Sequence, residues 1–308
     1  MKFRAVPGTK IKVSEIGFGV WTLAVGNEHE REVRARHLIH YALDRGINFF
    51  ETADSCAEGL AETLLGGILH EERSRVVIAT KFGHDFYPHE NFGDLLEENV
   101  GRLNFSPKYL RFACEKSLRR LKTDWIDFYQ IHHPTMNAVL RDDLYAALEK
   151  LKKEGKILSW GAALGPAADW IEEGKLLMRL RQVPHLRIAF SLFDPEHGWE
   201  LMRETEKKNT ALFAAMPHLF GSRISEIRKS LEVFSFLTEG GRRTLAQAAI
   251  EFVLSHKKVL CAIADITEES QINEFAPTSE CPDLSGAELD RIRKLYAQSE
   301  LTRFRQAG

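Results

Sequence analysis

The sequence contains few cysteines, and they are not spaced as in known metal or disulfide sites. Its 308 residues include only Cys56, Cys114, Cys261 and Cys281, with no CxxC pair and no zinc-binding spacing. Small secreted domains that depend on disulfides are much richer in cysteine. The pattern excludes a disulfide scaffold and is typical of a reducing compartment, so we expect a cytoplasmic protein.

Long apolar runs and an excess of charge are also missing. No apolar stretch approaches the ~20 residues of a transmembrane helix, and the polar N-terminus does not resemble a secretory signal. The 42 Lys and Arg residues nearly balance the 44 Asp and Glu residues. Because nucleic acids and anionic membranes attract a basic field, we expect neither as a partner, and a small-molecule substrate instead. The composition leaves the oligomeric state open.

Short apolar runs alternate with helical patterns along most of the chain. Eight runs are typical of buried strands and lie near residues 16–19, 47–50, 76–80, 125–131, 157–163, 186–192, 211–216 and 259–264. Amphipathic stretches with i, i+3, i+4, i+7 spacing lie between them, clearest around Leu110 and Leu144. Eight strand-helix alternations predict an α/β fold, a single (β/α)8 TIM barrel spanning residues 1–308.

Several additions to the eight repeats are also predicted. Pro7-Gly8 marks a turn between two short strands and predicts an N-terminal β-hairpin. Ser106-Pro107 marks a helix start, and two further helical segments follow the last strand. The longest insertions, 84–105 and 219–243, follow the third and seventh strands, on the face where such barrels place active-site loops.

Three titratable residues stand at the ends of three consecutive strands. Glu51, Lys81 and His132 follow the second, third and fourth apolar runs. The carboxyl ends of barrel strands share one mouth, so we expect an acid, an amine and an imidazole to converge there. The alternative is that each is an ordinary strand-end charge, paired or solvated. His133 points the other way if the strand continues, and we expect it to line the pocket or support a loop rather than to donate a proton.

The motifs around these residues resemble the aldo-keto reductase family. They run along nearly the whole chain and read VSEIGFGVW, ALDRGINFFETAD, ETLLG, VVIATKFG, SLRRLKTDWIDFYQIHHP, LEKLKKEGKI, FSLFDPE and ESQINE. The resemblance implies a (β/α)8 barrel closed at its base by a hairpin. It also implies reversible hydride transfer between NADP(H) and a carbonyl or alcohol, helped by a tetrad of Asp, Tyr, Lys and His.

Two tetrad members are kept and two are replaced. Lysine falls on Lys81 and histidine on His132, whereas Glu51 replaces the aspartate and Cys56 replaces the tyrosine that protonates the carbonyl oxygen. A general acid must lie within hydrogen-bond distance of its target, and a cysteine side chain is much shorter than a phenol. Cys56 therefore does not simply replace tyrosine. It is either a nucleophile with His132 as its base or a space-filling residue.

The positions that the resemblance assigns to the cofactor depart further from the family. At the nicotinamide, Ala163 and Leu164 replace the family's Ser and Asn, and Arg187 replaces its Gln. Ala215 and Met216 replace the Tyr-Ser pair that often precedes the proline, here Pro217. In the last phosphate-binding segment the corresponding residues are Asp265, Thr267, Gln271, Glu274 and Phe275. Only Gln271 and Glu274 match the family there. Asp265 replaces a glycine and would repel a phosphate, so we expect NADP(H) binding to be weak or absent.

The remaining pocket candidates are aromatic. We expect Trp21, His84 and His133 to line the substrate pocket, although Trp21 could instead be a rim residue that packs on a loop. His84, His89, His132 and His133 could approach one another, but their spacing fits no metal motif, so no metal site is predicted.

Three functions are compatible with these residues. The favoured interpretation is a divergent aldo-keto-reductase-like enzyme that acts on a small organic molecule by acid-base chemistry, as a lyase, isomerase or hydrolase. The second is an NADP(H)-dependent aldehyde or ketone oxidoreductase with an atypical tetrad. The third is a non-catalytic binding or regulatory subunit.

Overall fold

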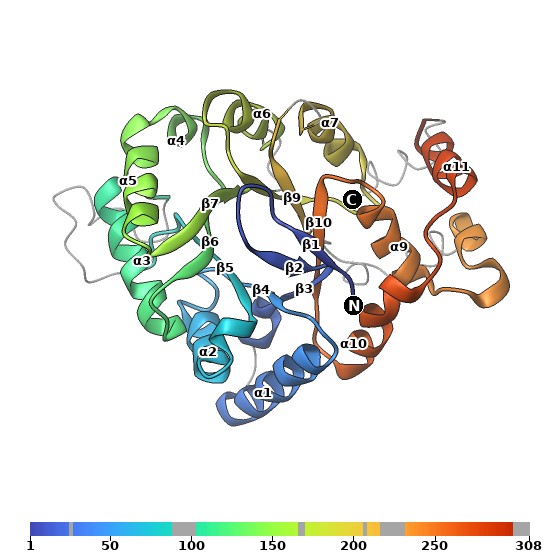
Figure 1. Cartoon of the computed structure of the whole chain (residues 1–308), viewed down its shortest axis with the longest axis horizontal. Helices are drawn as coiled ribbons and strands as arrows, with labels where there is room; N and C mark the ends of the chain where they lie inside the picture. The colour runs from blue at the N-terminus through green and yellow to red at the C-terminus, as the bar shows by residue number, and fades with distance from the viewer. Residues whose placement is uncertain (25–26, 88–102, 166–169, 206–207, 216–231, 298–308) are drawn as a thin grey trace.

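Eight parallel strands close into a barrel at the centre of the molecule (Figure 1). The computed structural model describes all residues except 25–26, 88–102, 166–169, 206–207, 216–231 and 298–308. The barrel strands, in chain order, are Ile16–Gly19 (β3), Phe49–Glu51 (β4), Val77–Phe82 (β5), Ile126–His132 (β6), Ile157–Ala163 (β7), His185–Ala189 (β8), Ala211–Ala215 (β9) and Val259–Asp265 (β10). All eight overlap the predicted runs, so the (β/α)8 barrel is confirmed.

Helices surround the barrel and connect its strands. They are Glu28–Asp44 (α1), Leu60–Leu69 (α2), Pro107–Leu121 (α3), Met136–Leu140 (α4), Asp142–Lys153 (α5), Trp170–Leu180 (α6), Glu196–Thr205 (α7), Leu245–Leu254 (α9), Glu269–Phe275 (α10) and Gly286–Ala297 (α11). Short 3-10 turns occupy Val20–Ala24 (η1), Arg73–Arg75 (η2), Ser235–Leu237 (η3), Glu239–Gly241 (η4) and Ala276–Glu280 (η5). The predicted start of α3 is confirmed, because the Ser106 hydroxyl accepts a hydrogen bond from the Tyr109 amide at 3.3 Å.

The N-terminal hairpin closes the base of the barrel, as predicted. Its strands Phe3–Ala5 (β1) and Lys12–Ser14 (β2) pair antiparallel in a separate sheet. Arg4 donates a 2.6 Å hydrogen bond to the carbonyl of Val259, the first residue of β10. Val6 and Val13 pack against the apolar interior of the barrel. The hairpin therefore covers the amino ends of the strands and leaves the carboxyl ends as the mouth.

The barrel interior is apolar at the base and polar toward the mouth. Phe49, Phe128 and Phe213 fill the base, with 5.0 Å between the ring centroids of Phe49 and Phe213. Since strand side chains alternate between faces, residues two positions further along also face inward. On β4, β5, β6 and β8 the inward residues of this upper layer are Glu51, Lys81, Gln130 and Arg187. The alternation thus stacks a charged layer directly on an aromatic one.

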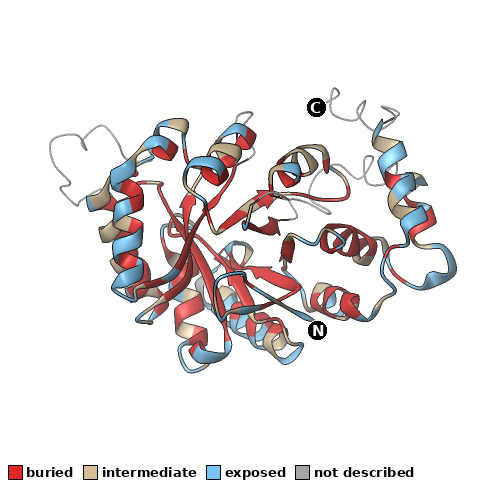
Figure 2. Ribbon diagram, turned by 45° about the horizontal axis from the view of Figure 1, so that its top comes forward, coloured by how far each residue is buried: buried red, intermediate tan, exposed pale blue. Residues whose placement is uncertain are grey.

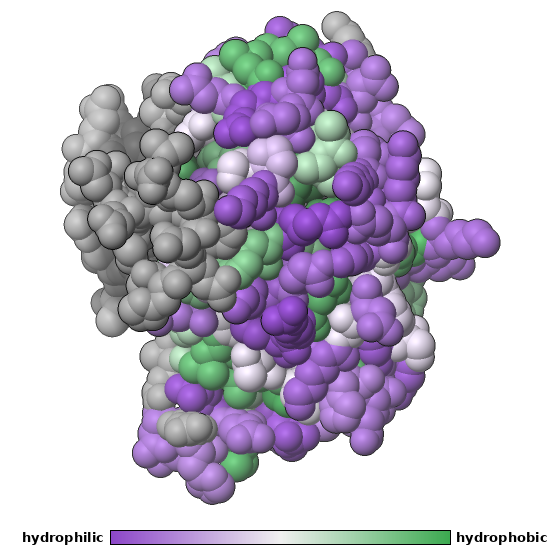
Figure 3. Space-filling model, turned by 90° about the vertical axis from the view of Figure 1, so that its left-hand side faces the viewer, coloured by the Kyte–Doolittle hydropathy of each residue, from purple (hydrophilic) through white to green (hydrophobic). Residues whose placement is uncertain are grey.

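The larger apolar core lies between the barrel and its helices. Buried residues line the strands and the helix faces turned toward them, whereas the outer helix faces are exposed (Figure 2). On the side that carries α3 and α5, apolar residues form scattered patches on a mostly hydrophilic surface (Figure 3). Every helix in the described part of the chain is too short or too polar to cross a membrane.

Candidate active site

A buried charge centre lies at the mouth of the barrel, where the predicted residues meet. Lys81 and Glu51 form an ion pair, and Lys81 also donates a 2.7 Å hydrogen bond to the Thr52 carbonyl. Arg187 Nε lies 3.4 Å from the same Glu51 oxygen. Burial alone would raise the pKa of Glu51, but Lys81 and Arg187 together lower it, so the carboxylate is charged. Two cations and one anion leave one positive charge uncompensated among these three groups.

Three imidazoles stand beside this charge centre. The ring centroid of His132 lies 4.7 Å from that of His84 and 4.3 Å from that of His133. Burial lowers the pKa of each ring, and for His132, the most buried, Lys81 lowers it further. The pKa of His133 falls to about 4. All three imidazoles are therefore neutral near pH 7.

His133 does not follow the geometry of a continuing strand. Strand β6 ends at His132, and His133 has a left-handed backbone with φ of +49°. The two rings consequently lie side by side rather than on opposite faces of the sheet. Gly165 leaves the necessary room, because a Cβ at that position would lie only 2.6 Å from the His133 ring. The strand does not continue through His133, so the prediction that His133 points away from His132 does not apply. Its role in lining the pocket stays a prediction.

Cys56 lies in the loop between β4 and α2, near the charge centre. Its amide donates a 3.1 Å hydrogen bond to the Ala53 carbonyl. Burial raises the pKa of the thiol, although Lys81 opposes this effect. The thiol is therefore protonated near pH 7, and no hydrogen bond joins it to His132 in the described structure. This geometry does not favour the nucleophile interpretation, which needs a thiolate within reach of its base.

A second buried polar cluster, which the sequence analysis did not single out, lies behind the charge centre. Arg120 on α3 donates to Glu62 at 2.7 Å and to the Tyr87 hydroxyl at 2.8 Å, and Thr80 donates to Glu62 at 2.6 Å. Asp54 is fully buried, and neither of its carboxyl oxygens has a hydrogen-bond partner among the described residues. Burial and the neighbouring Glu62 raise its pKa well above the ordinary value.

One sequence signal could have revealed this cluster. Glu62 falls in the apolar stripe of α2, three residues before Leu65 and seven before Leu69, and all three are buried. A carboxylate in such a stripe is almost never left unpaired, so its position predicts a buried cation. The partner itself, Arg120, was not predictable because it depends on how α2 packs against α3.

Comparison with known proteins identifies the family. The profile described as "Aldo/keto reductase family" matches residues 15–297. The chain belongs to the aldo/keto reductase family. The resemblance inferred from the motifs is confirmed.

The curated relatives of this aldo/keto reductase are named as oxidoreductases or reductases. An uncharacterized oxidoreductase of Bacillus subtilis, YqkF, is 30% identical over 209 residues, which cover 66% of this chain and 61% of that protein. The 6-dehydroglucose reductase of Novosphingobium aromaticivorans is 39% identical over 146 residues, covering 44% and 43%. Both matches span less than two thirds of those relatives. Methylglyoxal reductase YeaE of Escherichia coli is 26% identical over 287 residues, covering 93% and 92%.

Solved structures share the fold over almost the whole chain. The holo form of aldo-keto reductase AKR11C1 from Bacillus halodurans has a TM-score of 0.80 and 25% identity, and the match covers 96% of each chain. An aldo-keto reductase from Klebsiella pneumoniae in complex with NADPH has a TM-score of 0.75 and 24% identity, again with 96% of each chain covered. The barrel and its hairpin are therefore those of the family.

The residues at the family's phosphate-binding positions bond to one another. The Gln271 side chain accepts hydrogen bonds from the amides of Thr267 at 2.7 Å and Glu268 at 3.0 Å. In return, the Glu268 side chain accepts from the Gln271 amide. Asp265 accepts a 2.8 Å hydrogen bond from the indole of Trp21, whose side chain lies on the rim and is 42% exposed. Three amides that could face a phosphate are thus engaged by side chains of this aldo/keto reductase itself.

The remaining predicted cofactor positions offer few polar groups. Ala163 and Leu164 are buried, and Leu164 belongs to the core between barrel and helices, where Gly174 of α6 makes room for it. The Glu274 carbonyl accepts a 2.9 Å hydrogen bond from Gln247 of α9. Pro217, Met216 and His89 lie outside the described residues.

Proposed function

We propose that this member of the aldo/keto reductase family acts on a small organic carboxylate by acid-base chemistry, without hydride transfer from NADP(H). The observation that carries the proposal is the buried Glu51, Lys81 and Arg187 centre with His132 beside it and Cys56 in place of a phenol. The class of reaction is proton abstraction next to a carbonyl group, as in an isomerase or a lyase.

The uncompensated positive charge supports an anionic substrate. Two unit charges about 4 Å apart attract each other by about 4 kcal/mol at the effective dielectric near a protein surface, before desolvation costs. Lys81 is almost fully buried and already engages Glu51 and Thr52, whereas the Arg187 side chain is 24% exposed. Arg187 is therefore the group that can reach a substrate carboxylate. Lys81 neutralises Glu51, so the positive charge of Arg187 stays available to the substrate.

The neutral imidazole of His132 supports its role as the proton acceptor. Its neighbours Lys81 and Arg187 disfavour a second positive charge in the resting protein. A negatively charged substrate offsets those cations, so binding makes protonation of His132 less costly. The same two cations would stabilise the oxyanion that forms when a proton leaves the adjacent carbon.

The residues at the family's dinucleotide positions do not fit a bound NADP(H). At the family's phosphate positions they present Asp265, Glu268 and Glu269. The Thr267 and Glu268 amides just before α10 donate to the Gln271 side chain, and the Gln271 amide in its first turn donates to the Glu268 side chain. Anionic groups at this position repel a phosphate, and the Thr267, Glu268 and Gln271 amides, which could offset this repulsion, already have partners within the chain. This supports the expectation of weak or absent cofactor binding.

A second candidate function is NADP(H)-dependent carbonyl reduction. The retention of Lys81 and His132 favours it, as do the reductase names of the curated relatives. Titration with NADPH, followed by nicotinamide fluorescence, separates the two candidates. The acid-base proposal expects no saturable binding at micromolar NADPH, and tight binding with turnover of an aldehyde would overturn it.

Deuterium exchange tests the proposed chemistry directly. The protein is incubated in D2O with a panel of 2-oxo and 2-hydroxy carboxylates, and NMR follows deuterium entry at the carbon next to the carbonyl or hydroxyl group. We expect the wild-type protein to exchange at least one compound, and His132→Gln to lower the kcat of that exchange about 100-fold or more. Arg187→Gln should mainly raise KM, and His40→Gln, an exposed histidine on α1, should change neither. Equal exchange in His132→Gln and His40→Gln would refute the assignment.

A further inference from the structure

We propose that His84, His132 and His133 form a binding site for one divalent transition-metal ion of the zinc type. Each residue offers one ring nitrogen, and these three atoms lie within 4.8 Å of one another. The proposal concerns binding alone and does not depend on the proposed reaction. The sequence spacing contains no metal motif, because the ligands come from the ends of two strands, β5 and β6, that only the fold brings together.

The distances are close to those of a metal site. Zinc bonds imidazole nitrogen at about 2.0–2.1 Å, so a tetrahedral ion holds its ligand nitrogens about 3.4 Å apart. Rotation of the rings must therefore shorten the observed separations, of up to 4.8 Å, to this value. Three protein ligands leave the fourth position open, which is the arrangement of catalytic rather than structural zinc sites.

The three rings have no competing hydrogen-bond partners among the residues that the structure describes. Within the described residues, none of them donates or accepts a hydrogen bond, and Nδ1 of His132 is buried without a partner. A buried imidazole nitrogen without a partner costs free energy unless a ligand satisfies it. A metal ion at this position would satisfy all three rings at once.

The backbone is arranged to bring the rings together. His133 has φ of +49°, a conformation that costs a non-glycine residue on the order of 1 kcal/mol and is concentrated at functional sites. Gly83, with φ of +135°, turns the chain just before His84, and its lack of a side chain avoids a 2.5 Å contact with Phe105. Gly165 gives the His133 ring its space.

The neighbouring charges determine what completes the site. Lys81 and Arg187 repel a divalent ion, and Glu51 offsets only one of them. The open position is therefore best filled by an anion, such as hydroxide or a carboxylate, which reduces the local positive charge. A bound metal would also use the lone pair that His132 needs as a proton acceptor, so zinc should inhibit the proposed exchange reaction.

Cobalt(II) is a direct probe of this site, because tetrahedral Co²⁺ absorbs visible light. Purified protein is treated with a chelator, dialysed and titrated with Co²⁺ without substrate. We expect one equivalent to bind per chain, zinc to displace it, and acetate to tighten it. His84→Gln and His133→Gln should each weaken binding at least about tenfold, whereas the control His40→Gln should bind as wild type.

A second variant avoids the loss of a ligand. Gly165→Ala keeps all three histidines but pushes a Cβ into the His133 ring, so it should also weaken Co²⁺ binding, with folding checked by circular dichroism. Absence of a one-equivalent site in wild type, or unchanged binding in His84→Gln and His133→Gln, would overturn the metal site. That result would leave the deuterium exchange test unaffected, because the proposed exchange reaction requires no bound metal.

Discussion

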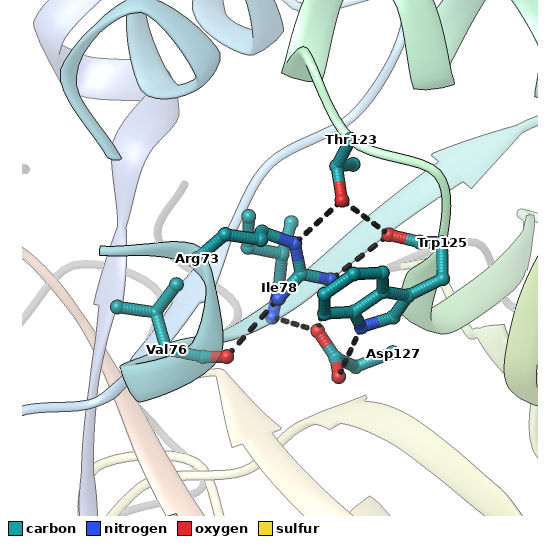
Figure 4. Close-up of polar contacts among 6 residues, drawn as sticks. All are labelled: Arg73, Val76, Ile78, Thr123, Trp125 and Asp127. Carbon is teal, nitrogen blue, oxygen red and sulfur yellow. Dashed lines mark hydrogen bonds and ion pairs between the residues drawn. The ribbon is translucent and has the colours of Figure 1, made fainter. Parts of the chain in front are cut away.

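The base and the mouth of the barrel both contain buried ion pairs, but the polar groups around these pairs differ in how fully they are hydrogen-bonded. At the base, Arg73 of η2 donates to Thr123 at 2.9 Å, to the Val76 and Trp125 carbonyls at 3.1 and 2.9 Å, and to Asp127 at 2.7 Å (Figure 4). Asp127 also accepts from the Ile78 amide and from the Trp125 indole. Every nitrogen of the Arg73 guanidinium thus has at least one protein acceptor.

At the mouth, several buried polar groups have no protein partner in the described structure. They are the Thr52 hydroxyl, the Asp54 carboxyl, the Gln130 amide and Nδ1 of His132. Each buried polar atom left without a hydrogen bond costs about 1–3 kcal/mol. A satisfied network joins loops and strands and stabilises the fold, whereas unsatisfied groups that converge on one opening are suited to bind a ligand. The comparison therefore assigns stability to the base and recognition to the mouth.

The largest effect on stability is expected at the base. Arg73→Met leaves Asp127 buried without its cation and should lower the free energy of unfolding by about 3–5 kcal/mol. Chemical denaturation measures this directly. Arg75→Met is the matched control, because Arg75 is exposed and its pair with Glu72 should contribute less than about 1 kcal/mol. Equal losses of unfolding free energy in the two variants would contradict the proposal that the Arg73 network at the base stabilises the fold.

A smaller loss of stability, with a distinct pH dependence, is expected for Glu51→Gln at the mouth. The variant leaves Lys81 beside Arg187 without its anion and should lower the free energy of unfolding by about 2–3 kcal/mol near pH 7. This loss is smaller than the one expected at the base because Arg187 can turn toward solvent. Since the folded-state pKa of Glu51 is lowered, its stabilisation is present above the unfolded-state pKa and is lost as pH falls through the folded value. Denaturation at several pH values should show the difference between wild type and variant shrinking below about pH 4.

Asp54 should show the opposite pH dependence, although it lies only three residues from Glu51. Its folded-state pKa is raised, so the protonated form stabilises the protein below the unfolded-state pKa, and this contribution is lost as pH rises toward the folded value. Asp54→Asn keeps the neutral form at every pH. We expect the variant to gain stability relative to wild type between pH 4 and pH 8, as measured by thermal or chemical unfolding. A constant difference over that range would show that Asp54 is ionised in the fold.

The base of the barrel and the charge centre were predictable from the sequence, for the same reason. Apolar runs identified the strands, and the position of Glu51 and Lys81 at the ends of two of them predicted that they meet at the mouth. A closed barrel brings all strand ends to one mouth, so residues far apart in the chain could be expected to meet. This inference needs only the strand positions and their order.

The sequence suggested that the histidines could approach one another, but it could not predict which rings meet, and the surroundings of Asp54 were beyond this reasoning. The meeting of His132 and His133 depends on one left-handed residue, and sequence patterns of alternation assume that the strand continues. The surroundings of Asp54 depend on the packing of α2 against α3, which places Arg120 beside Glu62. Both features follow from single backbone angles or helix contacts that no periodic pattern encodes.

The smallest effect concerns strain in the loop that carries Cys56. Ala57 and Glu58 have φ of +48° and +53°, and Gly59 follows with +87°, so three successive residues are left-handed. Ala57→Gly should stabilise the protein by about 0.5–1 kcal/mol, because the loss of the Cβ relieves more strain than the added flexibility of the unfolded chain costs. Gly59→Ala should have the opposite sign, since its Cβ would lie 2.7 Å from the Arg120 side chain. Thermal unfolding of both variants measures these two stability changes. Destabilisation by Ala57→Gly would show that this loop at the mouth stores no backbone strain.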